Sequence, residues 1–268
     1  ICDMGAPGLK HICRTGFAGQ TKIEDYPLSN RFDEVDTLVV FDDVEIPWEN
    51  VLFYRQTLAA SYMRAATFRY SAFPYIQRVL KWADMLIGVA LFSVRQTGLE
   101  RHQAVQEKLA ALACWREGIN AHLTASITMA ELSPGGLLMP NQSLLYSGRV
   151  LANSQLPAML HIARELCGGQ IGITPDVASF RNPETGPWLD KFYTISDDWV
   201  AEDRRKLIAF ARDLINSDYA GHRLTFQLFA QSPPFANLAS VYRAFDWDGP
   251  LAFVKKAAGL SDRVGIGD

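Results

Sequence analysis

Two long stretches of helical periodicity constrain this chain more than any other feature. Apolar residues recur at alternating spacings of three and four along residues 76–91, and a second such run follows along residues 105–127. A third helix is expected over residues 143–166. Three helices of about seven turns or more predict an antiparallel helical bundle. The apolar faces of the first two are also candidates for burial between subunits.

The second half of the chain carries weaker signals. Residues 167–193 contain several prolines and little periodicity, which predicts a long loop. Asp198 is expected to cap a fourth helix whose inner face lies within residues 207–215. A shorter helix is predicted over residues 221–230, and the tail beyond it is expected to be partly helical and loosely docked.

Residues 1–53 differ in character, because short β-prone runs alternate with turns. Residues 36–41 form an unbroken β-prone run, which suits a strand covered on both faces, and residues 44–46 resume extended structure. Pro47 and Trp48 then turn the chain out of the sheet. The predicted organisation is therefore a β region over residues 1–53, a helical domain over residues 54–235 and a tail over residues 236–268.

Composition excludes several classes of protein. The 268 residues are 49% hydrophobic and 21% charged, as in ordinary globular proteins. A net charge of -3 gives no electrostatic reason to expect nucleic acid or an anionic membrane as a partner. The longest apolar run, residues 86–94, is too short to span a bilayer. The four cysteines form no CxxC pair, which favours reduced thiols and a cytoplasmic protein.

The sequence opens abruptly, without an initiator methionine and with a strand predicted at residues 9–14. We expect missing sequence upstream of it. The chain is then a fragment, a processed product, or one of two polypeptides that pair, the other carrying the first half.

Few residues suggest chemistry on spacing alone. The five histidines are scattered, with no HExxH or paired-ligand spacing, so neither a metal site nor a catalytic residue is predicted. Gly168 and Gly169 have two interpretations. Glycine commonly ends helices, and bare backbone amides can also approach a phosphate. Spacing alone favours the helix cap.

Three segments together resemble a known family. They are YPLSNRFDEVDTLVVFDDVEIPWENVLFYR, RELCGGQIGITPDVASFRNPETGPWLDKFY and AEDRRKLIAFARDLINSDYAGHRLTFQLFAQSPP. In order and spacing they resemble the 4-hydroxyphenylacetate 3-monooxygenase family, the large oxygenase component of two-component flavin monooxygenases. The resemblance implies a mainly α chain: an acyl-CoA dehydrogenase-like C-terminal four-helix bundle, preceded by the end of a β domain, in a homo-oligomer that is usually a tetramer.

The implied activity is hydroxylation of a phenol by O2 and FADH2, with the reduced FAD supplied by a separate flavin reductase. In that family the residues that hold the phenol lie in the first half of the protein, which is absent here. The resemblance therefore assigns no catalytic residue to this chain and leaves it flavin binding and tetramer assembly.

Two segments are implied to contact FAD. The family's C-terminal flavin-contacting turn matches Ala230, Gln231, Ser232 and Pro233. A second segment lies where relatives offer glycine-rich backbone to the FAD of a neighbouring subunit, namely Cys167, Gly168, Gly169 and Gln170. The resemblance raises phosphate approach above the helix cap at these glycines, and both can hold together.

Rival functions stay open beside this one. A non-catalytic scaffold half would contribute only an oligomerisation surface. The superfamily also contains acyl-CoA dehydrogenases and the iron–sulfur enzyme 4-hydroxybutyryl-CoA dehydratase. The latter is disfavoured, because no cysteine or histidine occurs between Arg14 and Arg101, where part of its ligand set falls.

Overall fold

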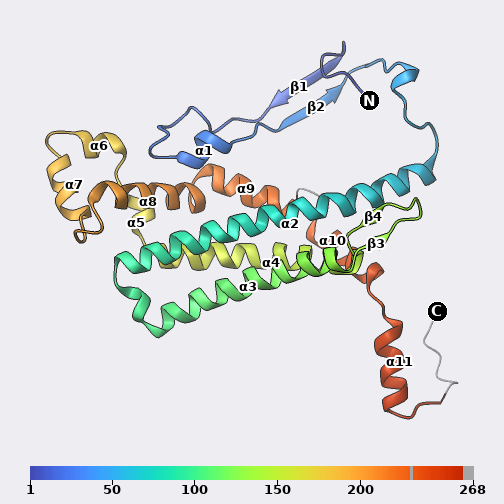
Figure 1. Cartoon of the computed structure of the whole chain (residues 1–268). Coiled ribbons are helices and arrows are strands. Elements are labelled where there is room, and N and C mark those ends of the chain that lie inside the picture. Colours follow the sequence, from blue (N-terminus) through green and yellow to red (C-terminus); the bar gives the residue numbers. More distant parts are fainter. Residues whose placement is uncertain (230–231, 262–268) are drawn as a thin grey trace.

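Three long helices form the body of the molecule. The computed structural model describes residues 1–229 and 232–261. In it α2 (Thr57–Gln96), α3 (Gln103–Thr128) and α4 (Gln142–Cys167) pack along one another, and α8 (Ala201–Ile215) contacts both α2 and α4 (Figure 1). The mainly helical bundle predicted from periodicity is confirmed. No helix in the described ranges combines the length and apolar character needed to cross a membrane.

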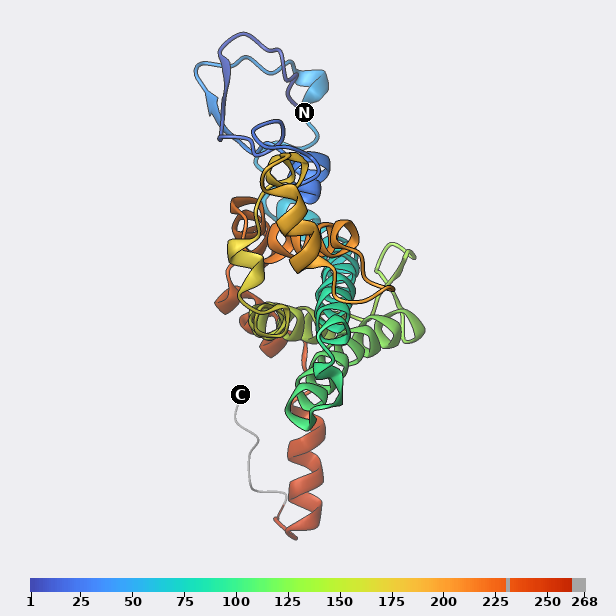
Figure 2. The same ribbon diagram turned by 90° about the vertical axis from the view of Figure 1, so that its left-hand side faces the viewer.

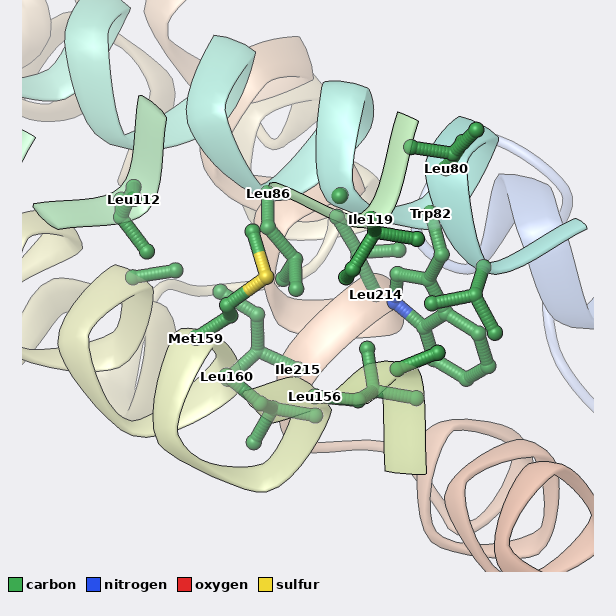
Figure 3. Packing of buried hydrophobic residues seen from close by; sticks show 14 of the residues in the cluster. Leu80, Trp82, Leu86, Leu112, Ile119, Leu156, Met159, Leu160, Leu214 and Ile215 are labelled. Atoms are coloured by element: carbon green, nitrogen blue, oxygen red, sulfur yellow. The ribbon is translucent and has the colours of Figure 1, made fainter. Parts of the chain in front are cut away.

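The core lies where these four helices meet. Leu86 of α2, Met159 of α4 and Leu214 of α8 each have 2% or less of their surface exposed, and Ile119 of α3 is fully buried beside them (Figure 3). Burial of a large aliphatic side chain stabilises a fold by about 1.5–3 kcal/mol. The buried part of α2 starts near Ala72, so its first turns project beyond the core.

Close packing of α3 on α4 depends on one glycine. A Cβ atom placed on Gly148 would lie 2.7 Å from the Cβ of His122, closer than packed atoms approach. Burial lowers the pKa of His122, which keeps its imidazole neutral at the helix contact. His122 is therefore a packing residue, and His161 is an exposed one.

The second half of the chain is more helical than its sequence predicts. The expected loop contains three short helices, α5 (Gln170–Ile173), α6 (Val177–Arg181) and α7 (Gly186–Tyr193). Asp176 caps α6 by accepting a hydrogen bond from the backbone N of Ser179 (2.9 Å). Helices this short leave no periodicity for a sequence pattern to reveal.

Asp198 does not cap the fourth helix, so that prediction is wrong. The helix begins at Ala201 and its N-cap is Val200, which makes no side-chain cap. A β-bridge between Ser196 and Trp199 holds the preceding residues in a turn. The first turn carries Glu202 and Asp203, whose negative charges interact favourably with the positive N-terminal end of the helix dipole. This interaction stabilises the helix start in place of a side-chain cap.

Three further helices follow α8 in the part of the chain that the structure describes. The predicted short helix is α9 (Asp218–Phe229), and it is followed by α10 (Pro234–Ala244) and α11 (Asp248–Ala257). Helix α10 packs against α4, whereas α11 extends away from the bundle at the end opposite the N-terminal strands (Figure 2). The division at residues 53 and 235 stays a prediction.

A two-stranded hairpin precedes the bundle. β1 (Leu9–Cys13) and β2 (Thr37–Phe41) pair antiparallel, with Leu9 opposite Phe41 and Cys13 opposite Thr37. All five residues of β2 are exposed, so the prediction of a strand covered on both faces is wrong for this chain. The apolar sequence is that of a sheet interior, but the described residues supply only one neighbouring strand. Residues 44–46, expected to be extended strand, belong to no strand.

Buried carboxylates tie the N-terminal segment to α8. Asp213 is fully buried, and its side chain accepts hydrogen bonds from the backbone N of Leu28 (2.6 Å) and Ser29 (2.8 Å) and from Ser29 Oγ. These donors belong to the first turn of α1 (Pro27–Phe32), whose own N-cap, Tyr26, makes no side-chain cap. Asp213 therefore satisfies the α1 terminus from 184 residues away.

A second carboxylate joins three segments at the same place. Asp25 is buried and accepts a hydrogen bond from the backbone N of Val177 (2.9 Å) at the start of α6. Arg205 and Arg212 of α8 each approach its Oδ1 at 3.8 Å. The loop before α1, the start of α6 and α8 are thus held by one group of charges.

Replacing Asp213 with alanine is expected to lower the free energy of unfolding by about 3 kcal/mol, because it leaves buried donors without an acceptor. Urea unfolding followed by circular dichroism measures the change. The matched control is Asp203→Ala on the exposed side of the same helix, which is expected to stay within about 0.5 kcal/mol of the parent. Equal losses in the two variants would contradict this role for Asp213.

Candidate functional site

A wide groove lies between α2, α9, α10 and the start of α4. Its volume is about 1070 Å³. Among the described residues, arginines, aromatic rings and hydroxyl groups line it, and no acidic side chain does. The lining residues are Ser61, Met63, Arg64, Ala65, Thr67, Phe68, Ser71, Arg78, Gln142, Tyr146, Phe226, Ser232, Phe235, Ala236, Ala239, Ser240 and Arg243.

Helical spacing brings these side chains to one surface. Arg64, Phe68 and Ser71 follow one another at intervals of four and three along α2, so they share a face of that helix. On α10, Ala236, Ser240 and Arg243 do the same. The groove therefore lies between two helix faces, both outside the apolar core of the bundle.

The groove is cationic. Arg64, Arg78 and Arg243 form no ion pair with any residue in the part of the chain that the structure describes. Arg243 donates a hydrogen bond to Ser240 Oγ (3.3 Å), and the guanidinium of Arg78 lies 5.7 Å from the ring centroid of Phe226. Guanidinium groups and hydroxyls are the side chains that best match phosphate or carboxylate oxygens, so the groove suits an anionic ligand with a flat apolar portion.

An aromatic pair forms one wall. The rings of Phe68 and Tyr146 meet edge to face, with centroids 5.4 Å apart. Burial raises the pKa of the Tyr146 phenol, so the group stays protonated at neutral pH. The wall is therefore uncharged and offers aromatic surface for a ring to pack against.

One of the two predicted FAD-contacting segments reaches this groove. Ser232 lines it and donates a hydrogen bond through Oγ to Oδ1 of Asn237 (2.6 Å). Pro233 is exposed and stands at the N-cap of α10. Ala230 and Gln231 lie outside the described residues.

The glycines of the other predicted segment end one helix and begin the next. Gly168 adopts a left-handed φ of 74°, and its N–H bonds the carbonyl of Arg164 (3.1 Å), which makes it the C-cap of α4. Gly169 is the N-cap residue of α5, and both glycines are exposed. A Cβ atom on either would meet nothing within 4 Å. The helix cap is thus present, and the space in front of the backbone is open.

The flanking residues of this segment have structural partners. Gln170 is exposed, and its Oε1 accepts a hydrogen bond from Arg204 Nη2. Burial raises the pKa of the Cys167 thiol, so the sulfur is neutral and poorly nucleophilic. Both side chains therefore fix the turn, which leaves its backbone as the part available to a ligand.

The structure does not bring the two predicted segments together within one chain. The groove adjoins the N-terminal end of α4, at Gln142 and Tyr146, whereas Gly168 follows its C-terminal end. A helix of 26 residues is roughly 39 Å long. No single small molecule spans that distance, so the two segments face different parts of the surface.

Sequence reasoning did not single out Arg64, Arg78 or Arg243. The available signal was the recurrence of arginine, aromatic and hydroxyl residues at helical spacing over residues 64–78, beside the more uniformly apolar run that follows. Helix α10 comes from a distant part of the sequence, so no local pattern could place Arg243 beside them.

The acidic residues near the hairpin are structural. Although burial opposes it, hydrogen bonds from Arg14 and from the backbone N of Phe17 lower the pKa of Asp33. Asp33 is therefore an ionised turn carboxylate with its partners in place. Among the described residues no group of three His, Cys, Asp or Glu side chains is arranged to hold a metal ion.

Two family models match the chain. The model described as 4-hydroxyphenylacetate 3-hydroxylase C terminal matches residues 59–259, and the model described as 4-hydroxyphenylacetate 3-hydroxylase N terminal matches residues 1–53. The first alone covers well over half of the chain.

Curated relatives agree with these matches. The chain is 28% identical to the 4-hydroxyphenylacetate 3-monooxygenase oxygenase component of Thermus thermophilus, over 90% of this chain and 50% of the relative. It is 28% identical to the protein of the same name from Pseudomonas aeruginosa, over 99% of this chain and 53% of the relative. A 4-nitrophenol 2-monooxygenase oxygenase component from a Rhodococcus species is also 28% identical, over 84% of this chain and 44% of the relative. The chain thus spans about half the length of the curated relatives it matches.

Solved structures share the fold. The oxygenase component of 4-hydroxyphenylacetate 3-monooxygenase superposes with a TM-score of 0.87 at 26% identity, over 95% of this chain and 55% of that one. Its complex with FAD and 4-hydroxyphenylacetate gives 0.86. An archaeal 4-hydroxybutyryl-CoA dehydratase gives 0.86 at 20% identity, which shows a common fold alone. The predicted acyl-CoA dehydrogenase-like fold is confirmed, and the chain belongs to the 4-hydroxyphenylacetate 3-hydroxylase family.

Proposed function

We propose that this chain is the C-terminal part of a two-component aromatic hydroxylase, which uses FADH2 and O2 to hydroxylate a phenolic substrate. The observation that carries the proposal is the acid-free arginine groove beside Ser232. Family membership and relatives named as monooxygenases support it.

The groove fits a phosphate-bearing aromatic cofactor. Arg64, Arg78 and Arg243 supply cations without competing carboxylates, and the rings of Phe68 and Phe235 supply surface for a flat ring system. A flavin cofactor would supply the oxygen chemistry, and this chain's residues would bind it, orient it and exclude water from it. FAD is assigned because the related oxygenase is solved with FAD bound.

The second contact to the cofactor is proposed to come from a neighbouring subunit. Cys167, Gly168, Gly169 and Gln170 would present backbone amides to the FAD held in the groove of another copy, within a tetramer. The length of α4 supports this arrangement, because it separates these glycines from their own chain's groove.

Other partners follow from the same proposal. The groups that hold the phenol would come from a segment equivalent to the first half of the relatives, and a separate flavin reductase would supply reduced FAD. Both faces of β2 are exposed and apolar, which suits burial against that first half. The proposal includes the division into a β region over residues 1–53, a helical domain over residues 54–235 and a tail over residues 236–268. It also includes a cytoplasmic location.

Replacing Arg64 or Arg243 with glutamine is expected to weaken FAD binding by about tenfold each, because a charge-assisted contact to phosphate is lost. Each change should also flatten the dependence of binding on salt concentration. Titration of flavin fluorescence at two ionic strengths measures both effects. Arg101→Gln, on an exposed turn remote from the groove, is the control. Equal affinity in all the variants would place the cofactor elsewhere.

Replacing Gly169 with valine is expected to weaken FAD binding by tenfold or more while changing the melting temperature by less than about 2 °C. Its φ of −64° is ordinary for any residue and its Cβ direction is open, so only a ligand would meet the new side chain. Gly172→Val, equally open and on the same short helix, is the matched control. Comparable losses of affinity and stability would leave these glycines as helix caps only.

The chain should be produced with and without a segment equivalent to the relatives' first half. FAD-dependent thermal stabilisation and phenol hydroxylation are expected in full only for the combined protein. Full hydroxylation by the chain alone would contradict the proposed location of the phenol-binding groups. Flavin-free, inactive assembly of the combined protein would instead indicate a scaffold.

A further inference from the structure

Arg149 of α4 is a buried guanidinium without a hydrogen-bonding partner. Only 2% of its surface is exposed. Its charge lies 4.6 Å from the ring centroid of Phe68 and 5.5 Å from that of Tyr75, both on α2. Nε and Nη1 have no hydrogen-bond acceptor within the described part of the chain. The surroundings of this cation are therefore aromatic rather than acidic.

No described neighbour neutralises the charge. The titratable side chains that face Arg149 are Tyr75 and Tyr146, and burial raises the pKa of both, so they are neutral. Burial also lowers the pKa of Arg149 to about 10, which leaves it charged at neutral pH. Nearby, Asn153 accepts a hydrogen bond from Tyr75 through Oδ1, and its Nδ2 donor has no partner either.

The other buried arginines have hydrogen-bond acceptors: Arg204 donates to Gln96 (3.2 Å) and Gln170, and the remaining two are also ion-paired. Arg69 lies 2.8 Å from Glu131 and donates from Nε to the carbonyl of Pro140 (2.6 Å). Arg205 bonds Glu202 through two nitrogens, at 2.8 and 2.9 Å. An unpaired buried charge is among the most destabilising features a protein can retain. Arg149 is therefore costly to the fold as it stands, which points to a negative charge supplied from outside the described residues.

The position of Arg149 indicates where that charge binds. Phe68 and Tyr146 form the aromatic wall of the groove, and Arg149 stands directly behind Phe68. A flat ligand packed on the open side of that wall would have its centre roughly 8–10 Å from the guanidinium. At that distance, in a partly desolvated site, one positive charge is worth roughly tenfold in the affinity of an anion.

We infer that Arg149 is the buried counter-cation of an anionic ligand in the groove, acting through the Phe68–Tyr146 wall rather than by direct contact. The ligand class is a phosphate-bearing or otherwise anionic molecule with a flat ring. The inference rests on the proposed function only for the identity of that ligand as a flavin. Arg149 is a positioning residue, and it makes the groove selective for negative charge at the expense of the stability of the empty protein.

The test uses Arg149→Met, which keeps an unbranched, flexible side chain of somewhat smaller size but removes the charge. The melting temperature of the ligand-free protein is expected to rise, because a buried unpaired charge is replaced by an apolar group. The affinity for inorganic pyrophosphate is expected to fall about tenfold in calorimetric titration, and that for FAD by a similar factor. Arg149→Lys, which restores a charge, is expected to recover most of the affinity.

The matched control is Arg205→Met. Arg205 is equally buried but is paired, and it lies on α8 outside the groove, so its loss should lower the melting temperature and leave pyrophosphate affinity unchanged. If Arg149→Met retains the parent affinity for pyrophosphate, the inference is overturned whatever happens to stability. If Arg149→Met fails to fold, Arg149→Lys is compared with Arg149→Gln. Equal affinities of these two variants for pyrophosphate overturn the inference likewise. Loss of pyrophosphate affinity without loss of FAD affinity supports the counter-cation and separates it from the flavin assignment.

Discussion

The carboxylate of Asp213 joins α8 to α1, two segments that lie far apart in the sequence. It accepts three hydrogen bonds from the first turn of α1, which lies 184 residues earlier, and it is completely removed from solvent. Asp25, which lies just before α1, strengthens the same contact through Arg205 and Arg212 of α8. The direction in which the β1–β2 hairpin leaves the bundle depends on this joint, and so does the position of any segment that covers the hairpin. A buried carboxyl group is tolerated here because two of its hydrogen bonds also satisfy backbone N–H groups at a helix terminus.

Helix positions were predictable from the sequence because the apolar faces of α2, α3 and α4 are long enough for periodicity to stand out. The strand at residues 37–41 was predictable from an unbroken β-prone run. Its exposure was not, since β propensity reports a preference for burial rather than the presence of a covering partner. The short helices after α4 escaped prediction because four to eight residues are too few to show periodicity, and of the three only α6 has a side-chain cap, Asp176. The turn containing Ser232 was predicted from the family resemblance. The arginine groove was not predicted, because its walls come from α2, α4 and α10, which are separate in the sequence.

Helix α4 links the features of functional interest while keeping them apart. Its first two turns border the groove, its third turn carries Arg149, and its last residue precedes the exposed glycines. Because it is rigid and packed along its length, the two ends cannot approach one another. A ligand that touches both kinds of surface therefore requires a second copy of the chain, so binding and assembly would be thermodynamically coupled.

The unpaired edges of the β1–β2 hairpin affect the kinetics of folding. Each of its strands has one unpaired edge, and β2 presents apolar side chains such as Leu38 and Phe41 to solvent. Such an edge pairs readily with any other extended chain, including an identical one. The helical body is built from local contacts and is expected to form quickly. If a segment equivalent to the relatives' first half covers the hairpin, as proposed, the hairpin would stay exposed until that partner binds. Productive folding then becomes a competition between capture of that partner and edge-to-edge association, and the outcome depends on protein concentration as well as on stability.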